Sequence, residues 1–218
     1  AEGYEERTVE TTRDPLRPED VRIALRPAAR VRGRVYGASG APAVLASVFG
    51  PLSAGLPDEE EPRSVRTDQS GAFVLDVPPD EGPVFVAVAA PGHRLALRWL
   101  RPGPEENAVI LMSAGADDVV TTLFSDGVPI RGAYFALVAG GIRVPTALLA
   151  AATAAGGCSF EPASRDGRSL FGGCVEPGTY DLFARVFRSG GAGYLPLGSY
   201  QFPLPPGIEL RSPLQDVP

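Results

Sequence analysis

The chain contains few side chains that could carry out catalysis. Its one histidine, His93, lies in residues 90–94, a Pro-Gly-containing run that is typical of a turn between strands. One imidazole cannot form a histidine-rich zinc site or an acid–base pair of imidazoles. The sequence also has no serine-hydrolase, zinc-protease or phosphate-loop motif. We therefore predict a protein that is not an enzyme and has no cofactor, with His93 exposed in a turn.

The 26 acidic residues leave carboxylate chemistry open. The densest group lies between two prolines and consists of Asp58, Glu59, Glu60 and Glu61. Adjacent like charges repel each other, so the favoured interpretation is a solvated loop. The alternative is a surface calcium site, because calcium prefers carboxylate oxygens, although the spacing is not that of an EF-hand loop. Asp117 and Asp118 form a second calcium candidate, and Asp68 is predicted to be a turn residue.

The only tryptophan, Trp99, lies in a run that alternates in polarity. This alternation predicts a strand with Leu95, Leu97 and Trp99 on one face. Packing of the ring into the core is the favoured interpretation. The alternative is a glycan-binding platform, in which an exposed aromatic ring stacks on a sugar ring. The exposure of Trp99 distinguishes the two, because a buried ring would remove the platform.

Cys158 and Cys174 are the only cysteines in the chain. A redox site would normally use the spacing C-x-x-C, and a zinc site would need two further ligands. We therefore predict a disulfide between them, formed in an oxidising compartment such as the periplasm, the cell surface or the extracellular medium. This bond would fasten an alanine-rich insertion at residues 146–155, where a single short helix is expected, to the adjacent strand.

The charge pattern disfavours several classes of partner. All 20 basic residues are arginine, and the net charge is −6. Nucleic-acid binding is not expected, because a phosphate backbone requires a clustered basic face. The absence of lysine excludes a lysine Schiff base and a Lys–Asn isopeptide crosslink. No membrane span is predicted, because the alanine-rich uncharged run at residues 144–160 is short and contains proline and glycine.

The elements that must carry these residues are predicted to be short strands. The chain contains 26 glycines and 23 prolines, which favour frequent turns over long helices. A pattern also recurs after 87 positions: Ile110 falls where Ile23 lies, and Gly127-Val128-Pro129 matches Gly40-Ala41-Pro42. A third copy of the first strand lies at residues 208–210. We interpret this strand as the one that closes each repeating unit immediately before the next begins.

The first unit carries further recognisable residues. They are Val31-Arg32-Gly33-Arg34-Val35, then Thr67-Asp68, Gly71, Phe73 and Leu75; the second unit has Pro177-Gly178-Thr179-Tyr180. This pattern resembles the carboxypeptidase regulatory-like, transthyretin-related sandwich family over about residues 29–112. The second unit departs from it at Thr122 and at the alanine-rich insertion. The resemblance implies an immunoglobulin-like β-sandwich that serves as a passive or binding module, and it implies little about a specific partner.

Together these observations predict an all-β chain of two tandem immunoglobulin-like, carboxypeptidase-regulatory-like sandwiches. Residues 27–113 and 114–218 form the two modules, and residues 1–26 are the terminal strands of a preceding unit or a segment for strand addition. The expected function is a non-catalytic structural, assembly or adhesive module of a bacterial envelope or surface protein. Its expected partners are other surface subunits, engaged by β-strand addition. The alternative is a carbohydrate-binding accessory module of a secreted enzyme.

Overall fold

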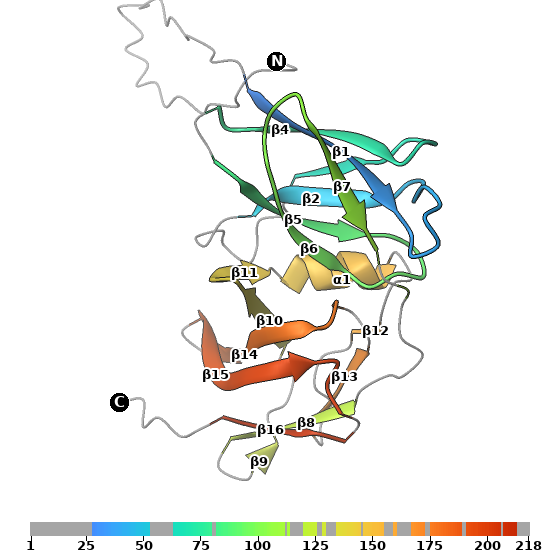
Figure 1. The fold of residues 1–218 in the computed structure, drawn as a ribbon. Coiled ribbons are helices and arrows are strands. Elements are labelled where there is room, and N and C mark those ends of the chain that lie inside the picture. The colour runs from blue at the N-terminus through green and yellow to red at the C-terminus, as the bar shows by residue number, and fades with distance from the viewer. Residues whose placement is uncertain are drawn as a thin grey trace, which may run out of the picture.

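The computed structural model is built almost entirely from strands (Figure 1). It contains 16 strands and one helix among the residues that it describes. The predicted all-β class is therefore confirmed. The described residues are 28–52, 63–79, 82–111, 113, 120–125, 128–129, 134–144, 146–154, 159–160, 167–172, 175–188, 191–205 and 207–212. Below, residues 28–113 are called the first half and residues 120–212 the second half.

Seven strands of the first half form two sheets that face each other. They are β1 (Ala29–Tyr36), β2 (Ser47–Leu52), β3 (Ser64–Arg66), β4 (Ala72–Val77), β5 (Val84–Ala89), β6 (Ala96–Leu100) and β7 (Glu106–Ile110). One sheet has the order β4-β1-β7 and the other has the order β3-β2-β5-β6. Buried side chains from both sheets form one cluster, which includes Val31, Leu75, Val86 and Val109. Alternate residues of the strands fill this core, as expected for a sandwich.

The motif residues of the first half have structural roles. The hydroxyl of Thr67 is buried, donates to the carbonyl of Ala43 at 2.7 Å and accepts from the amide of Ala46 at 2.8 Å. The carboxylate of Asp68 accepts hydrogen bonds from the amides of Ser70 and Ala72 and from the Ser70 hydroxyl. These bonds hold the turn before β4, as predicted for Asp68. They explain the Thr-Asp pair without any catalytic role.

The second half has strands in a corresponding arrangement. They are β8 (Val120–Ser125), β9 (Val128–Pro129), β10 (Tyr134–Ala139), β11 (Ile142–Val144), β12 (Ser159–Phe160), β13 (Arg168–Gly172), β14 (Gly178–Arg188), β15 (Gly191–Phe202) and β16 (Glu209–Ser212). One sheet has the order β11-β10-β14-β15, and the other has the order β12-β13-β8-β16 with β9 beside β8. The helix α1 (Thr146–Ala154) follows β11, in agreement with the short helix expected in the alanine-rich insertion.

The two halves share a pattern of strand pairing. In the first half β1 lies between β4, which is antiparallel to it, and β7, which is parallel. In the second half β8 lies between antiparallel β13 and parallel β16 in the same way. The other sheet of each half, β3-β2-β5-β6 in the first and β11-β10-β14-β15 in the second, also corresponds strand by strand. Each half thus begins and closes with strands that lie side by side.

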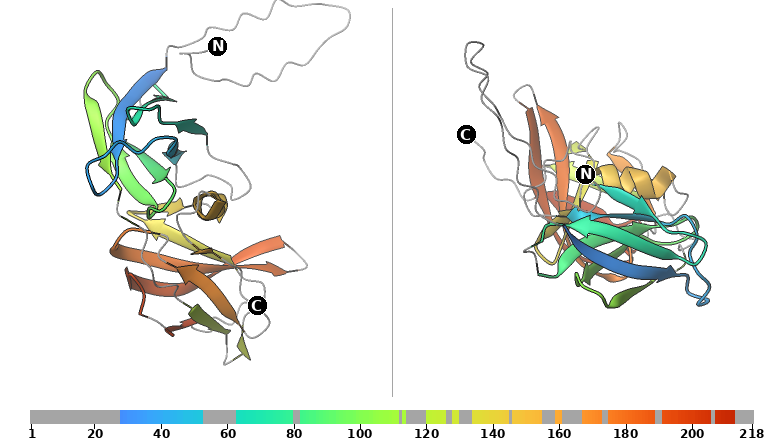
Figure 2. Two further views of the ribbon diagram at one scale, coloured as in Figure 1. Left: turned by 90° about the vertical axis from the view of Figure 1, so that its right-hand side faces the viewer. Right: turned by 90° about the horizontal axis from the view of Figure 1, so that it is seen from above.

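The helix α1 lies between the two halves (Figures 1 and 2). Figure 1 and the left view of Figure 2 place it below the sheet that contains β5 and β6, and above β10 and β14. Leu148 and Leu149 of this helix are fully buried in a cluster with side chains of both halves. Among the described residues, no helix has the length and apolar character needed to cross a membrane.

Candidate functional site

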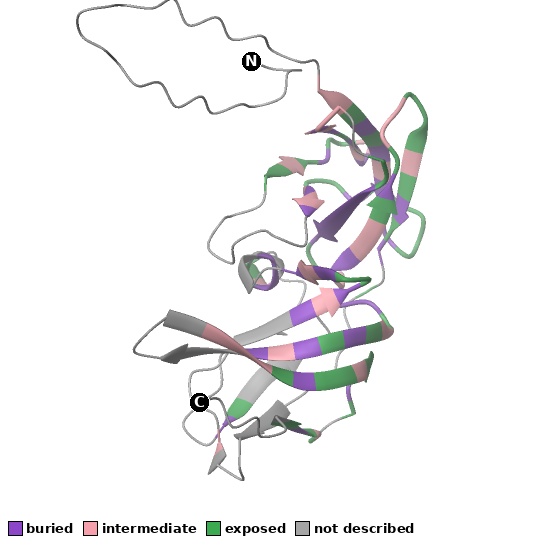
Figure 3. Cartoon of the chain, turned by 90° about the vertical axis from the view of Figure 1, so that its left-hand side faces the viewer, coloured by how far each residue is buried: buried purple, intermediate pink, exposed green. Residues whose placement is uncertain are grey.

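The strand β5 is buried on both of its faces (Figure 3). Val84, Val86 and Val88 point into the core of the first half. Phe85 and Ala87 alternate with them and belong to the cluster that continues into the second half. A strand at the surface of an antiparallel sandwich normally has one polar face. The second apolar face of β5 is therefore the surface on which the second half docks.

The contact region between the two halves, called the joint below, brings together apolar side chains from segments that are far apart in the sequence. Phe85, Ala87 and Leu95 of the first half share one buried cluster with Leu149 of α1 and Ile142 of β11. Full burial of a leucine or phenylalanine side chain contributes about 1.5–3 kcal/mol. Several such side chains together oppose separation of the two halves. The joint thus has the chemical character of a protein core.

Backbone hydrogen bonds extend the joint at its edge. Leu95 and Val175 form a parallel β-bridge, and the amide of Glu176 donates to the carbonyl of Leu95 at 3.3 Å. The guanidinium of Arg94 donates to the carbonyl of Val175, also at 3.3 Å. These contacts join the first half, next to β6, to the segment that precedes β14. They fix the register between the two halves.

A two-pronged ion pair crosses the same joint. Arg98 of β6 donates through both terminal nitrogens to the carboxylate of Glu176, and the Nη2–Oε1 distance is 2.8 Å. The Glu176 side chain is only 9% exposed, whereas that of Arg98 is 35% exposed. The Tyr180 hydroxyl donates to the backbone carbonyl of Glu176 at 3.0 Å. Burial, and next the charge of Glu176, raise the pKa of the Tyr180 hydroxyl.

Trp99 lies at the rim of the joint and is 53% exposed. Its ring packs against Phe85 with a centroid distance of 5.1 Å. A Cβ atom added to Gly140, in the turn between β10 and β11, would lie 3.9 Å from the indole Nε1. The prediction that Trp99 packs into the core is therefore wrong. The predicted alternation is correct, but the strand face that carries these residues points toward the second half. The second half covers Leu95 and leaves Trp99 exposed.

His93 follows a turn at residues 91–92, as predicted, but it is half-buried instead of exposed. Its Nδ1 lies 2.7 Å from the carbonyl of Pro91, and a Cβ atom on Gly37 would lie 3.0 Å from its Nε2. The imidazole therefore packs between two turns. No group of three or more His, Cys, Asp or Glu side chains positioned for a metal ion occurs in the described part of the chain.

The other predicted site residues lie outside the described residues. They are the calcium candidates Asp58, Glu59, Glu60, Glu61, Asp117 and Asp118, and the cysteines Cys158 and Cys174.

Sequence reasoning missed the joint residues Arg98 and Glu176. One signal was present, because Arg98 stands between Leu97 and Trp99 in an otherwise apolar run. A charge in such a run needs a partner if the strand is covered. Nothing in the local sequence identifies Glu176, which is 78 positions away, as that partner.

Comparisons with known proteins gave structural matches alone. No protein-family model matches the sequence, and no match was found among curated proteins. The streptococcal ancillary pilin is 14% identical, with a TM-score of 0.31, over 92% of this chain and 68% of that chain. The TIE protein of Bacillus anthracis is 13% identical, with a TM-score of 0.29, over 86% of this chain and 34% of that one. The shaft pilin SpaA of Lactobacillus rhamnosus GG is 11% identical, with a TM-score of 0.27, over 88% and 100% of the two chains.

Proposed function

We propose that the chain is a non-catalytic structural or adhesive segment of a bacterial surface protein, in which two sandwich modules are held in a fixed orientation. The observation that carries this proposal is the joint, where an apolar core and the Arg98–Glu176 ion pair connect the two halves. A freely jointed pair of modules would expose the outer face of β5 to water, at a large hydrophobic cost. A fixed joint suits a protein that spaces or presents other surfaces.

Two further observations support modules at residues 27–113 and 114–218. The strand orders of the two halves correspond, with a parallel closing strand beside the first strand in each. The motif residues that resemble the carboxypeptidase regulatory-like family, Thr67 and Asp68, act in holding a turn. Both observations suit tandem copies of a passive sandwich.

Calorimetry tests the fixed joint. We expect the chain to unfold in one cooperative transition, with equal calorimetric and van't Hoff enthalpies. The variant Ala87→Arg places a charge in the joint, where Ala87 is fully buried, and should separate the transition into two. The matched control Ala108→Arg lies at an exposed position of β7 and should retain one transition. Two independent transitions in the unmodified chain would contradict the proposal.

A location outside the cytoplasm forms part of the same proposal, and a disulfide between Cys158 and Cys174 would accompany it. Mass spectrometry after alkylation without reductant should find neither thiol modified. Two alkylated cysteines would contradict the disulfide.

Carbohydrate binding is the second candidate, because Trp99 is exposed and offers its ring to solvent. The chain has one tryptophan, so its fluorescence reports on this ring alone. Titration with cell-wall polysaccharides should change the emission if sugars stack on Trp99. Trp99→Ala should abolish binding measured by calorimetry, whereas Ile110→Ala, at a position that is 59% exposed, should not. Unchanged emission with every glycan tested would reject this candidate.

A further inference from the structure

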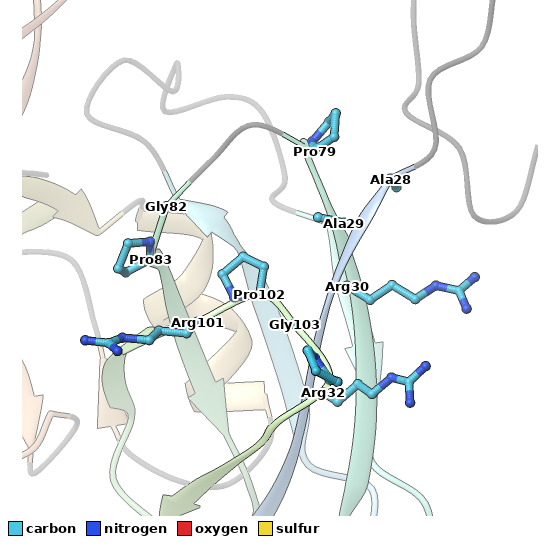
Figure 4. Close-up of a pocket in the computed structure, with 11 residues that line it drawn as sticks. Ala28, Ala29, Arg30, Arg32, Pro79, Gly82, Pro83, Arg101, Pro102 and Gly103 are labelled. Carbon is cyan, nitrogen blue, oxygen red and sulfur yellow. The ribbon is translucent and has the colours of Figure 1, made fainter.

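The first half has an open groove at the end where the chain enters it (Figure 4). The groove has a volume of about 840 Å³, and its lining includes four prolines: Pro79, Pro83, Pro102 and Pro104. The start of β1 forms another part of the lining. The guanidinium groups of Arg30 and Arg32 point to one side of these residues, and that of Arg101 points to the other. The groove therefore presents proline rings and backbone between flanking arginine side chains.

Hydrogen bonds hold the groove in shape. The amide of Gly103 donates to the carbonyl of Arg30 at 2.9 Å. The side-chain amide of Asn107 donates to the carbonyls of Arg32 and Arg101 and accepts from the Arg101 amide. These bonds tie the connection between β6 and β7 to β1. Because proline also restricts the backbone, docking on this surface would cost little conformational entropy.

The corresponding end of the second half is the end that docks on the first half. There, residues 175–177 precede β14, just as residues 82–83 precede β5. Pro203 and Pro205 follow β15, just as Pro102 and Pro104 follow β6. Val175 and Glu176, at this end, make the backbone contacts with Leu95. The same end of the sandwich is thus a docking surface in one half and an open groove in the other.

The outer face of the second half does not match this groove as a partner. In the first half, the paired outward residues Phe85 and Trp99 are aromatic and lie in or beside the joint. In the second half, the corresponding pairs are polar and exposed: Thr179 with Gln201, and Asp181 with Ser199. Terminal units of repeat proteins have such polar outer faces. A second copy of this chain is therefore a poor occupant of the groove.

The sequence identifies a better occupant. Ile110 in β7 and Leu210 in β16 belong to the closing strands of the two halves, each parallel to the first strand of its half. Ile23, in the repeated pattern, is the counterpart of Ile110. Residues 21–25 therefore have the sequence of a closing strand, and they lie directly before the groove in the chain.

We propose that the groove lined by Pro79, Pro83, Pro102 and Pro104 is the docking seat for a preceding sandwich module of the same polypeptide. That module presents an apolar outer sheet face of the kind that β5 and β6 present to the second half. This inference rests on the proposed two-module organisation and extends it to a third module on the entry side. The chain would then continue a stiff row of sandwiches.

Thiol labelling tests this seat. Pro104→Cys places a thiol on the exposed wall of the groove, and Ser39→Cys places a matched thiol at the opposite end of the first half. The labelling rate of each variant is measured in the isolated 218-residue chain and in the protein as its native organism produces it. The wild-type chain gives the background from Cys158 and Cys174. We expect maleimide to label Pro104→Cys at least about tenfold more slowly in the cell-produced protein, and Ser39→Cys equally in both. Equal labelling of Pro104→Cys would overturn the seat, while the calorimetric test of the joint would be unaffected.

A photo-crosslinker attached to the same cysteine identifies the occupant. Crosslinked peptides from a sandwich module that precedes residue 1 in the same polypeptide would support the proposal. Peptides from a different polypeptide would overturn it. Peptides solely from residues 1–27 would also overturn it, because the groove would then be filled by the adjoining segment.

Discussion

At the scale of residues, the glycine of the motif V-x-G-x-V lies where neighbouring atoms pack against the strand too closely to leave room for a side chain. Gly33, in the centre of β1, has the carbonyl oxygen of Asn107 and the ring of Phe73 beside it. An added Cβ atom would lie 2.6 Å from that oxygen and 2.7 Å from the ring. Neither the central strand β1 nor the buried ring can move away without disturbing the core. The glycine in the motif V-x-G-x-V is thus explained by packing.

Gly33→Ala should destabilise the first half through this clash. Overpacking of this kind typically costs about 1–3 kcal/mol. Gly82→Ala is the matched control, because a Cβ atom there meets no atom within 4 Å. Denaturant unfolding should show a lower midpoint for Gly33→Ala and an almost unchanged midpoint for Gly82→Ala. Equal midpoints for the two variants would contradict the packing account.

The Asp68 carboxylate predicts a dependence on acid. Its hydrogen bonds from the Ser70 side chain and from the backbone amides of Ala72 and Ser70 lower the pKa of Asp68. A lowered pKa means that the contribution to stability is complete above the unfolded value of about 3.9 and is lost as the pH falls through the folded value. Wild type should therefore lose more stability than Asp68→Asn as the pH falls through this acidic range. Thermal unfolding at a series of pH values measures this, and parallel curves would contradict it.

At the scale of elements, the local sequence correctly predicted strand faces and a helix, but it did not predict which faces are buried. The alternation of Leu95, Leu97 and Trp99 correctly predicted one strand face, and the alanine-rich insertion correctly predicted a helix. The side of the sheet that becomes covered depends on where the second half docks, which no local pattern encodes. Trp99 was therefore wrongly assigned to the core, and the joint residue Glu176 was not found.

The ion pair across the joint predicts a measurable coupling energy. Arg98→Met or Glu176→Met alone leaves the other charge in a poorly solvated place, and each should cost about 1–3 kcal/mol. In a double-mutant cycle, the variant with both substitutions should lose less stability than the two single variants lose in sum, because both charges are removed together. The exposed pair Arg30 and Asp76 is the matched control, with an expected coupling below about 1 kcal/mol. Equal coupling in the two cycles would show that the joint does not bury the pair.

At the scale of the whole molecule, the two halves are proposed to keep a fixed orientation relative to each other. The strand orders of the two halves correspond, and one buried cluster contains side chains from both halves. We propose that this cluster holds the two halves as a single rigid body. The repeat in the sequence pointed to two units. It did not reveal that the outer face of β5 would be apolar because a second unit covers it. That property arises from a buried cluster whose members in the two halves lie about 40 or more positions apart, such as Phe85 and Leu149.

Nuclear magnetic resonance relaxation of backbone amides measures this rigidity most directly. In a chain of 22.8 kDa, nitrogen-15 relaxation rates report how each half rotates in solution. The joint predicts that amides in residues 28–111 and in residues 120–212 fit one common rotational diffusion tensor. Ala87→Arg, which places a charge in the joint, should give each half its own, faster rotation. Separate tensors in the unmodified chain would contradict the fixed joint and the function proposed from it.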